Sequence, residues 1–231
     1  PNDPVINDVA FNNLINAVQV VQGVSLTGTA EAGARLELTV AGITKALTVN
    51  EQGQWTYTLN TGDFKALETS GADIKMVAVS VDAAGNRSNA VEKAFSVDTL
   101  AALLGLVRLA DARDTGALGD GRTSQRQPVI GFTAEEGATL FLDIGEGYAQ
   151  AASGSGALQQ LILSNAELID GNYTVKLKAV DAAGNESVRT ATIVVDATGP
   201  SITSGGLAAA IDLVKMKKKK NPKRQPDIFR K

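Results

Sequence analysis

The stretch Val81-Asp-Ala-Ala-Gly-Asn-Arg-Ser88 returns further along the chain as Val180-Asp-Ala-Ala-Gly-Asn-Glu-Ser187. Two other segments are repeated around it in the same order. Residues 30–38 return as 134–142, and Val97-Asp98 returns as Val195-Asp196, with offsets of 98 to 104 residues. Self-similarity at a nearly fixed period marks a repeated structural unit. The chain of 231 residues therefore contains one unit of roughly 100 residues twice.

Inside each unit, apolar and polar residues alternate with period two, as in half-buried strands. In residues 35–40, for example, Leu36, Leu38 and Val40 would face one side of a sheet. Clusters of Gly, Asn and Asp separate roughly seven such segments per unit. The sequence therefore predicts an all-β fold: two tandem immunoglobulin-like antiparallel β-sandwiches in an elongated arrangement. Trp55, in an alternating segment, is expected in the core, and Tyr173 is expected to form a tyrosine corner.

These repeats predict a division of the chain into a first repeat at 1–98 and a second at 99–200. Residues 201–231 are interpreted as a basic, disordered tail or as the start of a truncated third repeat. The opening Pro1-Asn2-Asp3-Pro4 resembles a linker, so we expect the chain to be cut from the interior of a longer protein. The sequence shows neither the layout of a signal peptide nor an apolar run of the roughly 18 residues that span a bilayer.

The composition excludes most enzyme chemistries. The chain has neither Cys nor His, so disulfides, thiolate nucleophiles and imidazole bases are absent. No nucleophile or phosphate-binding motif compensates for them, and we expect no enzyme activity. Residues 1–214 hold 13 basic and 24 acidic residues, a net charge of −11. Such a surface repels nucleic acid and anionic lipid and attracts cations, so neither nucleic acid binding nor membrane insertion is expected.

Four stretches carry a resemblance to a known family: GTAEAGARLELTV (28–40), EQGQWTYTL (51–59), DGNYTVKLKAVDAAGNES (170–187) and the closing VDAT (195–198). They resemble the bacterial Ig-like repeats of large biofilm and host-attachment adhesins, many of which are secreted by type I systems. The resemblance covers residues 5 to 200. It implies an extracellular spacer on the bacterial cell surface that supports cell adhesion or biofilm formation. Its partners would be neighbouring Ig-like repeats of the same chain, with host or biofilm-matrix ligands as further candidates.

The resemblance also implies calcium at the junctions between repeats. Carboxylates are the only charged metal ligands in the chain, and calcium prefers oxygen. Sandwich topology places three groups of acidic and amide side chains at the ends of the two units. The group at the junction is Asp98, Glu135, Glu136, Asp181 and Asn185. The group at the start of the first unit is Asp3, Asp82 and Asn86, near Glu31. The group at the end of the second unit is Asp111, Asp114, Asp120 and Asp196.

Other interpretations remain open. Asp and Asn at hairpin tips also form turns and cap backbone N–H groups without any metal. A carbohydrate- or matrix-binding module is the alternative function, although aromatic residues make up only 4% of the chain. The segment KMKKKKNPKRQPDIFRK (215–231) is basic enough to bind nucleic acid or anionic membranes. It has no counterpart in the repeat, so we assign it no function.

Overall fold

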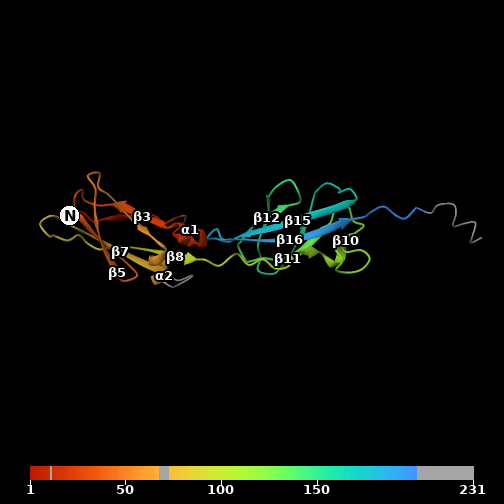
Figure 1. Ribbon diagram of the computed structural model, residues 1–231, viewed down its shortest axis with the longest axis horizontal. Coiled ribbons are helices and arrows are strands. Elements are labelled where there is room, and N and C mark those ends of the chain that lie inside the picture. Colours follow the sequence, from red (N-terminus) through yellow and green to blue (C-terminus); the bar gives the residue numbers. More distant parts are fainter. Residues whose placement is uncertain (11, 68–72, 202–231) are drawn as a thin grey trace, which may run out of the picture. The chain divides into compact units, whose positions relative to one another are not determined.

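The computed structural model describes residues 1–10, 12–67 and 73–201, and Figure 1 shows its elements in chain order. Two sets of strands form four sheets, and two short α-helices belong to the first set. Among the helices in this described part of the chain, none is long and apolar enough to cross a membrane. The expected basic segment lies almost entirely outside the described residues, and 197–201 have no regular secondary structure.

The first sandwich pairs a three-stranded sheet with a five-stranded one. The smaller sheet has the order β1-β3-β6, and the larger has the order β2-β8-β7-β4-β5. Its elements are β1 (Val5–Ile6), β2 (Leu14–Asn16), α1 (Ala17–Gln22), β3 (Val24–Thr29), β4 (Arg35–Val40), β5 (Ile43–Thr48), β6 (Gln54–Leu59), α2 (Thr61–Leu67), β7 (Asp73–Val81) and β8 (Val91–Asp98).

The second sandwich repeats this plan, with sheets β9-β11-β14 and β10-β16-β15-β12-β13. In both sandwiches the first strand is split: its first half pairs antiparallel in the small sheet and its second half pairs parallel with the last strand. The elements are β9 (Arg108–Leu109), the 3-10 helix η1 (Asp111–Arg113), β10 (Arg122–Thr123), β11 (Val129–Thr133), β12 (Thr139–Asp143), β13 (Ala149–Ser153), β14 (Leu158–Ile162), β15 (Gly171–Val180) and β16 (Glu186–Val195).

Each sandwich encloses its own apolar cluster, and the period-two alternation explains how. Leu36, Leu38 and Val40 of β4 are buried, while the residues between them lie on the outer face. The two clusters share no residue: one runs from Ile6 to Val97 and the other from Ala102 to Ile193. Burial of alternate side chains is the main driving force for packing two sheets face to face. The predicted all-β fold of tandem Ig-like sandwiches is confirmed.

Two finer predictions about single residues are also confirmed. Trp55 is 3% exposed and belongs to the first core. The Tyr173 hydroxyl donates to the main-chain oxygen of Ile169 at 2.9 Å, which is the bond of a tyrosine corner. The two α-helices were not predicted, because the alternation of apolar and polar residues that is typical of strands dominates the sequence around them. The boundaries of the two repeats stay a prediction.

Gly28 offers a test of this packing. It lies opposite Trp55 in the β3–β6 ladder, and a Cβ built on it would stand 1.9 Å from the Val5 oxygen and 2.5 Å from the Trp55 ring. We expect Gly28→Ala to destabilise the first sandwich by about 1–3 kcal/mol, because the backbone of β1 cannot move away without breaking its ladder.

Gly131 of β11 provides the matched control. Its built Cβ would meet no atom closer than 3.9 Å, so Gly131→Ala should change stability by less than about 0.5 kcal/mol. Urea unfolding followed by the fluorescence of the single Trp reports on the first sandwich, and circular dichroism reports on both. Equal effects of the two substitutions would contradict the close contact at Gly28.

Candidate functional site

The turn between β15 and β16 is organised by one carboxylate. Asp181 Oδ1 accepts from the main-chain N–H groups of Ala183 and Asn185, each at 2.8 Å. Its Oδ2 accepts from Asn185 Nδ2 at 3.0 Å. Gly184 takes a φ of 88°, which a residue with a Cβ rarely adopts. Asp and Asn favour such turns because their side chains replace missing main-chain partners. The turn is therefore rigid, and the side chain of Asn185 is held in one orientation.

Asn185 also connects this turn to the first sandwich. Its Nδ2 donates to the main-chain oxygen of Asp98 at 2.9 Å, and its Oδ1 accepts from the Ala17 N–H at 2.9 Å. A third bond runs from Asn16 Nδ2 to the Ala183 oxygen at 3.1 Å. We call these residues, Asn16, Ala17, Asp98, Ala183 and Asn185, the seam. Three hydrogen bonds between groups from opposite sides thus join the two sandwiches directly.

The first sandwich presents its half of the seam through α1. Asn16 is the N-cap of this helix: its side-chain oxygen accepts from the Gln19 N–H, and the Gln19 side chain accepts from the Asn16 N–H, both at 2.9 Å. This reciprocal capping box leaves the N–H of Ala17 without a partner inside the helix. Asn185 supplies that partner from the second sandwich. The seam therefore satisfies a main-chain donor that the helix alone leaves open.

The polar groups of Asn185 are fully used. A side-chain amide has two N–H donors and one carbonyl oxygen. Both donors are engaged, with Asp98 and Asp181, and the oxygen is engaged with Ala17. Asn185 is only 7% exposed and Asp181 only 9%. A buried amide group that lacks a hydrogen-bond partner costs free energy of folding. The seam is therefore held in the arrangement that pairs both donors and the oxygen of Asn185.

The linker that follows Asp98 is fastened to the second sandwich as well. The main-chain N–H of Leu103 donates to Glu135 Oε2 at 2.9 Å, and the Glu135 N–H donates back to the Leu103 oxygen at 2.8 Å. Ser187 Oγ donates to the Ala102 oxygen at 2.6 Å. The side chain of Asp98 itself caps the Leu100 N–H at 3.0 Å. Glu136 lies beside Gly156 and takes part in none of these bonds.

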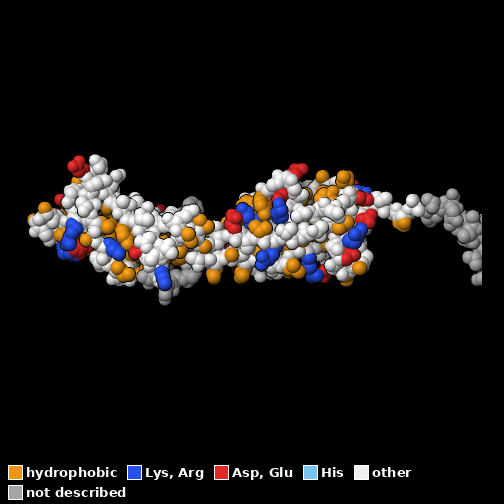
Figure 2. Space-filling model, viewed as in Figure 1, with side chains coloured by type: hydrophobic (Ala, Val, Ile, Leu, Met, Phe, Trp, Pro, Cys, Tyr) orange, Lys and Arg blue, Asp and Glu red, His pale blue; other side chains and the backbone are white. Residues whose placement is uncertain are grey.

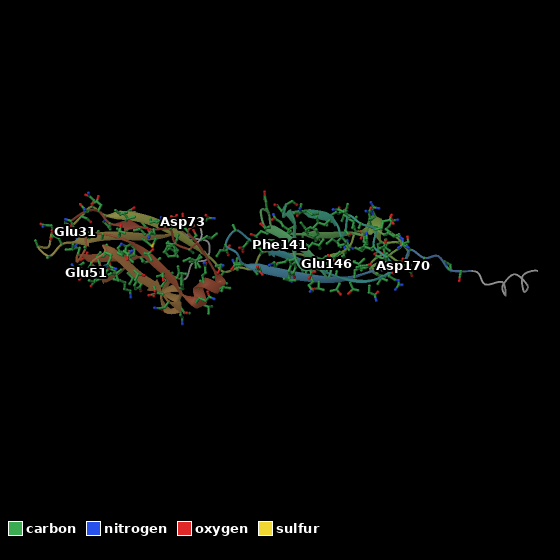
Figure 3. All side chains as sticks on the ribbon, turned by 90° about the horizontal axis from the view of Figure 1, so that it is seen from above. Glu31, Glu51, Asp73, Phe141, Glu146 and Asp170 are labelled. Carbon is green, nitrogen blue, oxygen red and sulfur yellow. The ribbon has the colours of Figure 1, made fainter. Side chains whose placement is uncertain are left out.

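The corresponding residues of the first sandwich form a turn with the same bonds. Asp82 accepts from the main-chain N–H and the side-chain Nδ2 of Asn86, each at 2.8 Å. These two bonds hold the pKa of Asp82 below its ordinary value of 3.8. Asp3 accepts from the N–H and Nδ2 of Asn89 at 2.9 and 3.1 Å. The Pro1 nitrogen lies 3.9 Å from both Glu31 and Asp82, and Figure 3 shows Glu31 at the end of the sandwich opposite Asp73.

In the third predicted group, three members lie between β9 and β11, and Asp196 directly follows β16. Asp111 pairs with Arg108 at 3.2 Å, Asp196 with Arg122 at 3.5 Å, and Asp120 accepts from the Arg122 N–H at 2.8 Å. Asp114 differs from them, because it is 8% exposed and its Oδ2 accepts from the Gly119 N–H at 2.6 Å. Among the described residues, no hydrogen-bond partner reaches its buried Oδ1.

Figure 2 shows acidic side chains at both ends of the second sandwich. They do not converge, however. Within 1–10, 12–67 and 73–201 no three acidic side chains lie close enough together to hold a metal ion. At the seam, one side-chain oxygen of Asp98, one of Glu135 and both of Asp181 accept hydrogen bonds. Because the described acidic side chains do not converge, these residues as they lie do not fit a calcium site. Calcium binding by the predicted groups stays a prediction, and the alternative of turn formation and capping accounts for the observed bonds.

Three of the five seam residues were not predicted from the sequence. They are Asn16 and Ala17 of the first sandwich and Ala183 of the second. The signal for α1 was present in Asn16-Ala-Val-Gln19, where a capping residue precedes a glutamine by three positions. The hydrogen bond from Asn16 to Ala183 joins residues that are 167 positions apart, and a local sequence pattern cannot indicate such a contact.

The two equivalent asparagines allow a matched test of the seam. Asn185→Ala and Asn86→Ala remove the same bonds within their turns, but only Asn185→Ala removes the bonds to Ala17 and Asp98. We expect Asn185→Ala to cost about 1–2 kcal/mol more than Asn86→Ala. It should also speed hydrogen exchange at the Ala17 amide, measured by NMR. If both variants left Ala17 equally protected, the bond across the seam would be refuted.

Comparison with known proteins agrees with this architecture. Residues 103–197 match the family model described as bacterial Ig-like domain. No curated protein matches the sequence. A Ca2+-stabilized adhesin with which an Antarctic bacterium reaches out and binds ice has a similar structure, with 24% identity, a TM-score of 0.50, and coverage of 87% of this chain and 50% of that one.

Two further solved structures are similar over most of the chain. A 1.5-MDa bacterial ice-binding adhesin has 18% identity and a TM-score of 0.48, covering 84% of this chain and 63% of that one. The fibronectin(III)-like modules of Clostridium thermocellum CbhA have 13% identity and a TM-score of 0.49, covering 87% and 98%. The chain thus spans less than two thirds of the length of the two adhesin chains. Residues 103–197 in the second sandwich thus match the bacterial Ig-like domain model, and the first sandwich repeats the motifs and the strand order of the second.

Proposed function

We propose that the two sandwiches are spacer repeats of a bacterial cell-surface adhesin. Such repeats hold a binding domain away from the cell and support cell adhesion or biofilm formation. The role is mechanical, since the chain transmits position and force from one repeat to the next. The main support is the seam, where three hydrogen bonds join neighbouring sandwiches. The match of residues 103–197 to bacterial Ig-like domains supports the same class of protein.

A spacer must resist bending at its joints, and the linker is built for that. A free linker samples many backbone conformations, and fixing each residue costs roughly 1–2 kcal/mol of conformational entropy. Here the residues after Asp98 are fixed by bonds to Glu135 and Ser187, and Asp98 is fixed by Asn185. These bonds of the folded state therefore keep the spacer extended. The partner of each sandwich is its neighbour in the chain.

The alternative, a carbohydrate- or matrix-binding module, has less support. Sandwiches that bind sugars by stacking need exposed aromatic faces. Trp55, the single Trp, is buried in the first core. Tyr57 is engaged with Asp63, and Tyr173 forms the tyrosine corner. These three aromatic side chains thus serve the folds of their own sandwiches, whereas Tyr148 is 42% exposed and has the Lys178 ammonium 5.2 Å from its ring centroid.

The spacer proposal can be tested with two measurements on the full chain. Because the sequence has no Cys, spin labels can be attached at Thr56→Cys and Gln160→Cys, two exposed strand positions. We expect a narrow label-to-label distance distribution by pulsed EPR and no binding on glycan and matrix-protein arrays. A broad distribution, as from a free hinge, would contradict the spacer role. Specific binding to an array component would favour the alternative function.

We further propose that calcium stabilises the second sandwich, with Asp114 as the first ligand to examine. A carboxylate that is 8% exposed and leaves one buried oxygen unpaired is costly to fold, and a cation would offset that cost. Calcium takes mixtures of carboxylate, carbonyl and water oxygens. The surplus of acidic residues in 1–214 raises the local cation concentration. The similar Antarctic adhesin, itself Ca2+-stabilized, adds support.

The variant Asp114→Asn distinguishes calcium binding at Asp114 from burial of this carboxylate without an ion. In EGTA the variant should be more stable than the unchanged chain, because it removes a buried charge. In excess calcium the order should reverse, since only the unchanged chain gains about 2–3 kcal/mol from an ion present at a hundredfold its Kd. Thermal unfolding followed by circular dichroism measures both conditions. Asp111→Asn, at an exposed ion pair, is the control, and a calcium effect that survives in Asp114→Asn would rule out this ligand.

A further inference from the structure

The two turns that carry the repeated sequence have the same internal geometry. In the turn 82–86, the Asp82 N–H donates to the Asn86 oxygen at 3.1 Å and the Gly85 N–H to the Asp82 oxygen at 3.0 Å. In the turn 181–185 the equivalent distances are 3.1 and 3.2 Å. The carboxylate-to-amide bond measures 2.8 Å in one turn and 3.0 Å in the other. Both turns therefore present the same polar groups in the same arrangement.

The two turns differ in their exposure to solvent. Asn185 is 7% exposed because the first sandwich lies on it, whereas Asn86 is exposed. Three groups that are used at the seam are open at the first turn: the Asn86 side-chain oxygen, the second Nδ2 hydrogen of Asn86 and the Ala84 oxygen. None of them makes a hydrogen bond within the described part of the chain. The turn 82–86 is thus the open counterpart of an interface that is closed one repeat later.

We propose that the turn 82–86 is a docking surface for the helix-bearing end of another sandwich placed ahead of the first. This inference rests on the proposed spacer function and names a partner. The partner presents a main-chain N–H to Asn86 Oδ1, a carbonyl oxygen to Asn86 Nδ2, and an N-cap amide to the Ala84 oxygen. Ala17, Asp98 and Asn16 present these groups at the seam. The end of the first sandwich that carries α1 is therefore itself the best model of the partner.

The geometry favours a sandwich over a free cation as the occupant. Both oxygens of Asp82 already accept hydrogen bonds from Asn86. A cation would compete with these bonds for the lone pairs of the carboxylate, whereas a docking sandwich uses only the groups that are still open. At the seam the equivalent carboxylate, Asp181, keeps all its bonds within the turn while the first sandwich is docked.

The test adds a sandwich to the full chain. Residues 1–101 are joined ahead of Pro1, so that Asp98 of the leading copy stands four residues before Pro1, as Asp98 stands four residues before Ala102 at the seam. Spin labels at Thr56→Cys in the leading copy and in the copy behind it report the new joint by pulsed EPR. We expect a distance distribution as narrow as the one between the two sandwiches of the chain itself, in EGTA as well as in calcium.

Substitutions then assign the new joint to the proposed contacts. Asn86→Ala in the second copy should broaden the distribution of the new joint several-fold and leave the original seam narrow, while Asn185→Ala should do the reverse. Asn16→Ser in the leading copy gives a second variant, because serine keeps the N-cap oxygen but loses the amide that would reach Ala84. It should broaden the new joint while the helix stays capped.

Three outcomes would overturn the inference. The new joint could be broad under all conditions, narrow only in calcium, or unaffected by Asn86→Ala and Asn16→Ser. A broad new joint beside a narrow original seam refutes the docking surface alone. A broad original seam refutes the spacer function as well, so the two failures can be told apart.

Discussion

The side-chain amide of Asn185 is the group on which the joint between the sandwiches depends. It satisfies a carboxylate in its own turn, a carbonyl oxygen at the end of β8 and the open N–H of a helix in the first sandwich. Its position follows from the fold below it. The turn is held by Asp181, and the ladder between β15 and β16 fixes the turn relative to the second core. The joint therefore depends on the geometry of the turn, and the turn depends on the packing of the second sandwich.

Hydrogen bonds and bound ions make different demands on the same residues. An ion needs several oxygens that converge on one point. A hydrogen-bonded turn needs those oxygens turned toward main-chain N–H groups. At the seam Asp98, Asp181 and Glu135 all follow the second arrangement. Among the acidic side chains predicted as calcium ligands, Asp114 alone keeps a buried oxygen that has no hydrogen-bond partner in the described part of the chain.

Much of the fold could be predicted from the sequence because it is encoded locally. Alternation marks the strands, Asp-Ala-Ala-Gly-Asn marks the hairpin turn, and the position of Tyr173 marks its bond to Ile169. The seam could be predicted only in part. Asp98, Asp181 and Asn185 were expected together from topology, but their bonding was expected to involve an ion. The role of Asn16 was missed, since its partner is 167 residues away and depends on how two folded surfaces meet.

The split first strand has a consequence for a chain under load. In each sandwich the second half of that strand runs parallel to the last strand and is hydrogen-bonded to it, β2 to β8 and β10 to β16. Tension applied through the two ends of a sandwich would pull these neighbours in opposite directions along their length. The bonds between them would then have to break together, in shear, rather than one after another as in an unzipping hairpin. Each module is thereby arranged to stay folded while it is stretched.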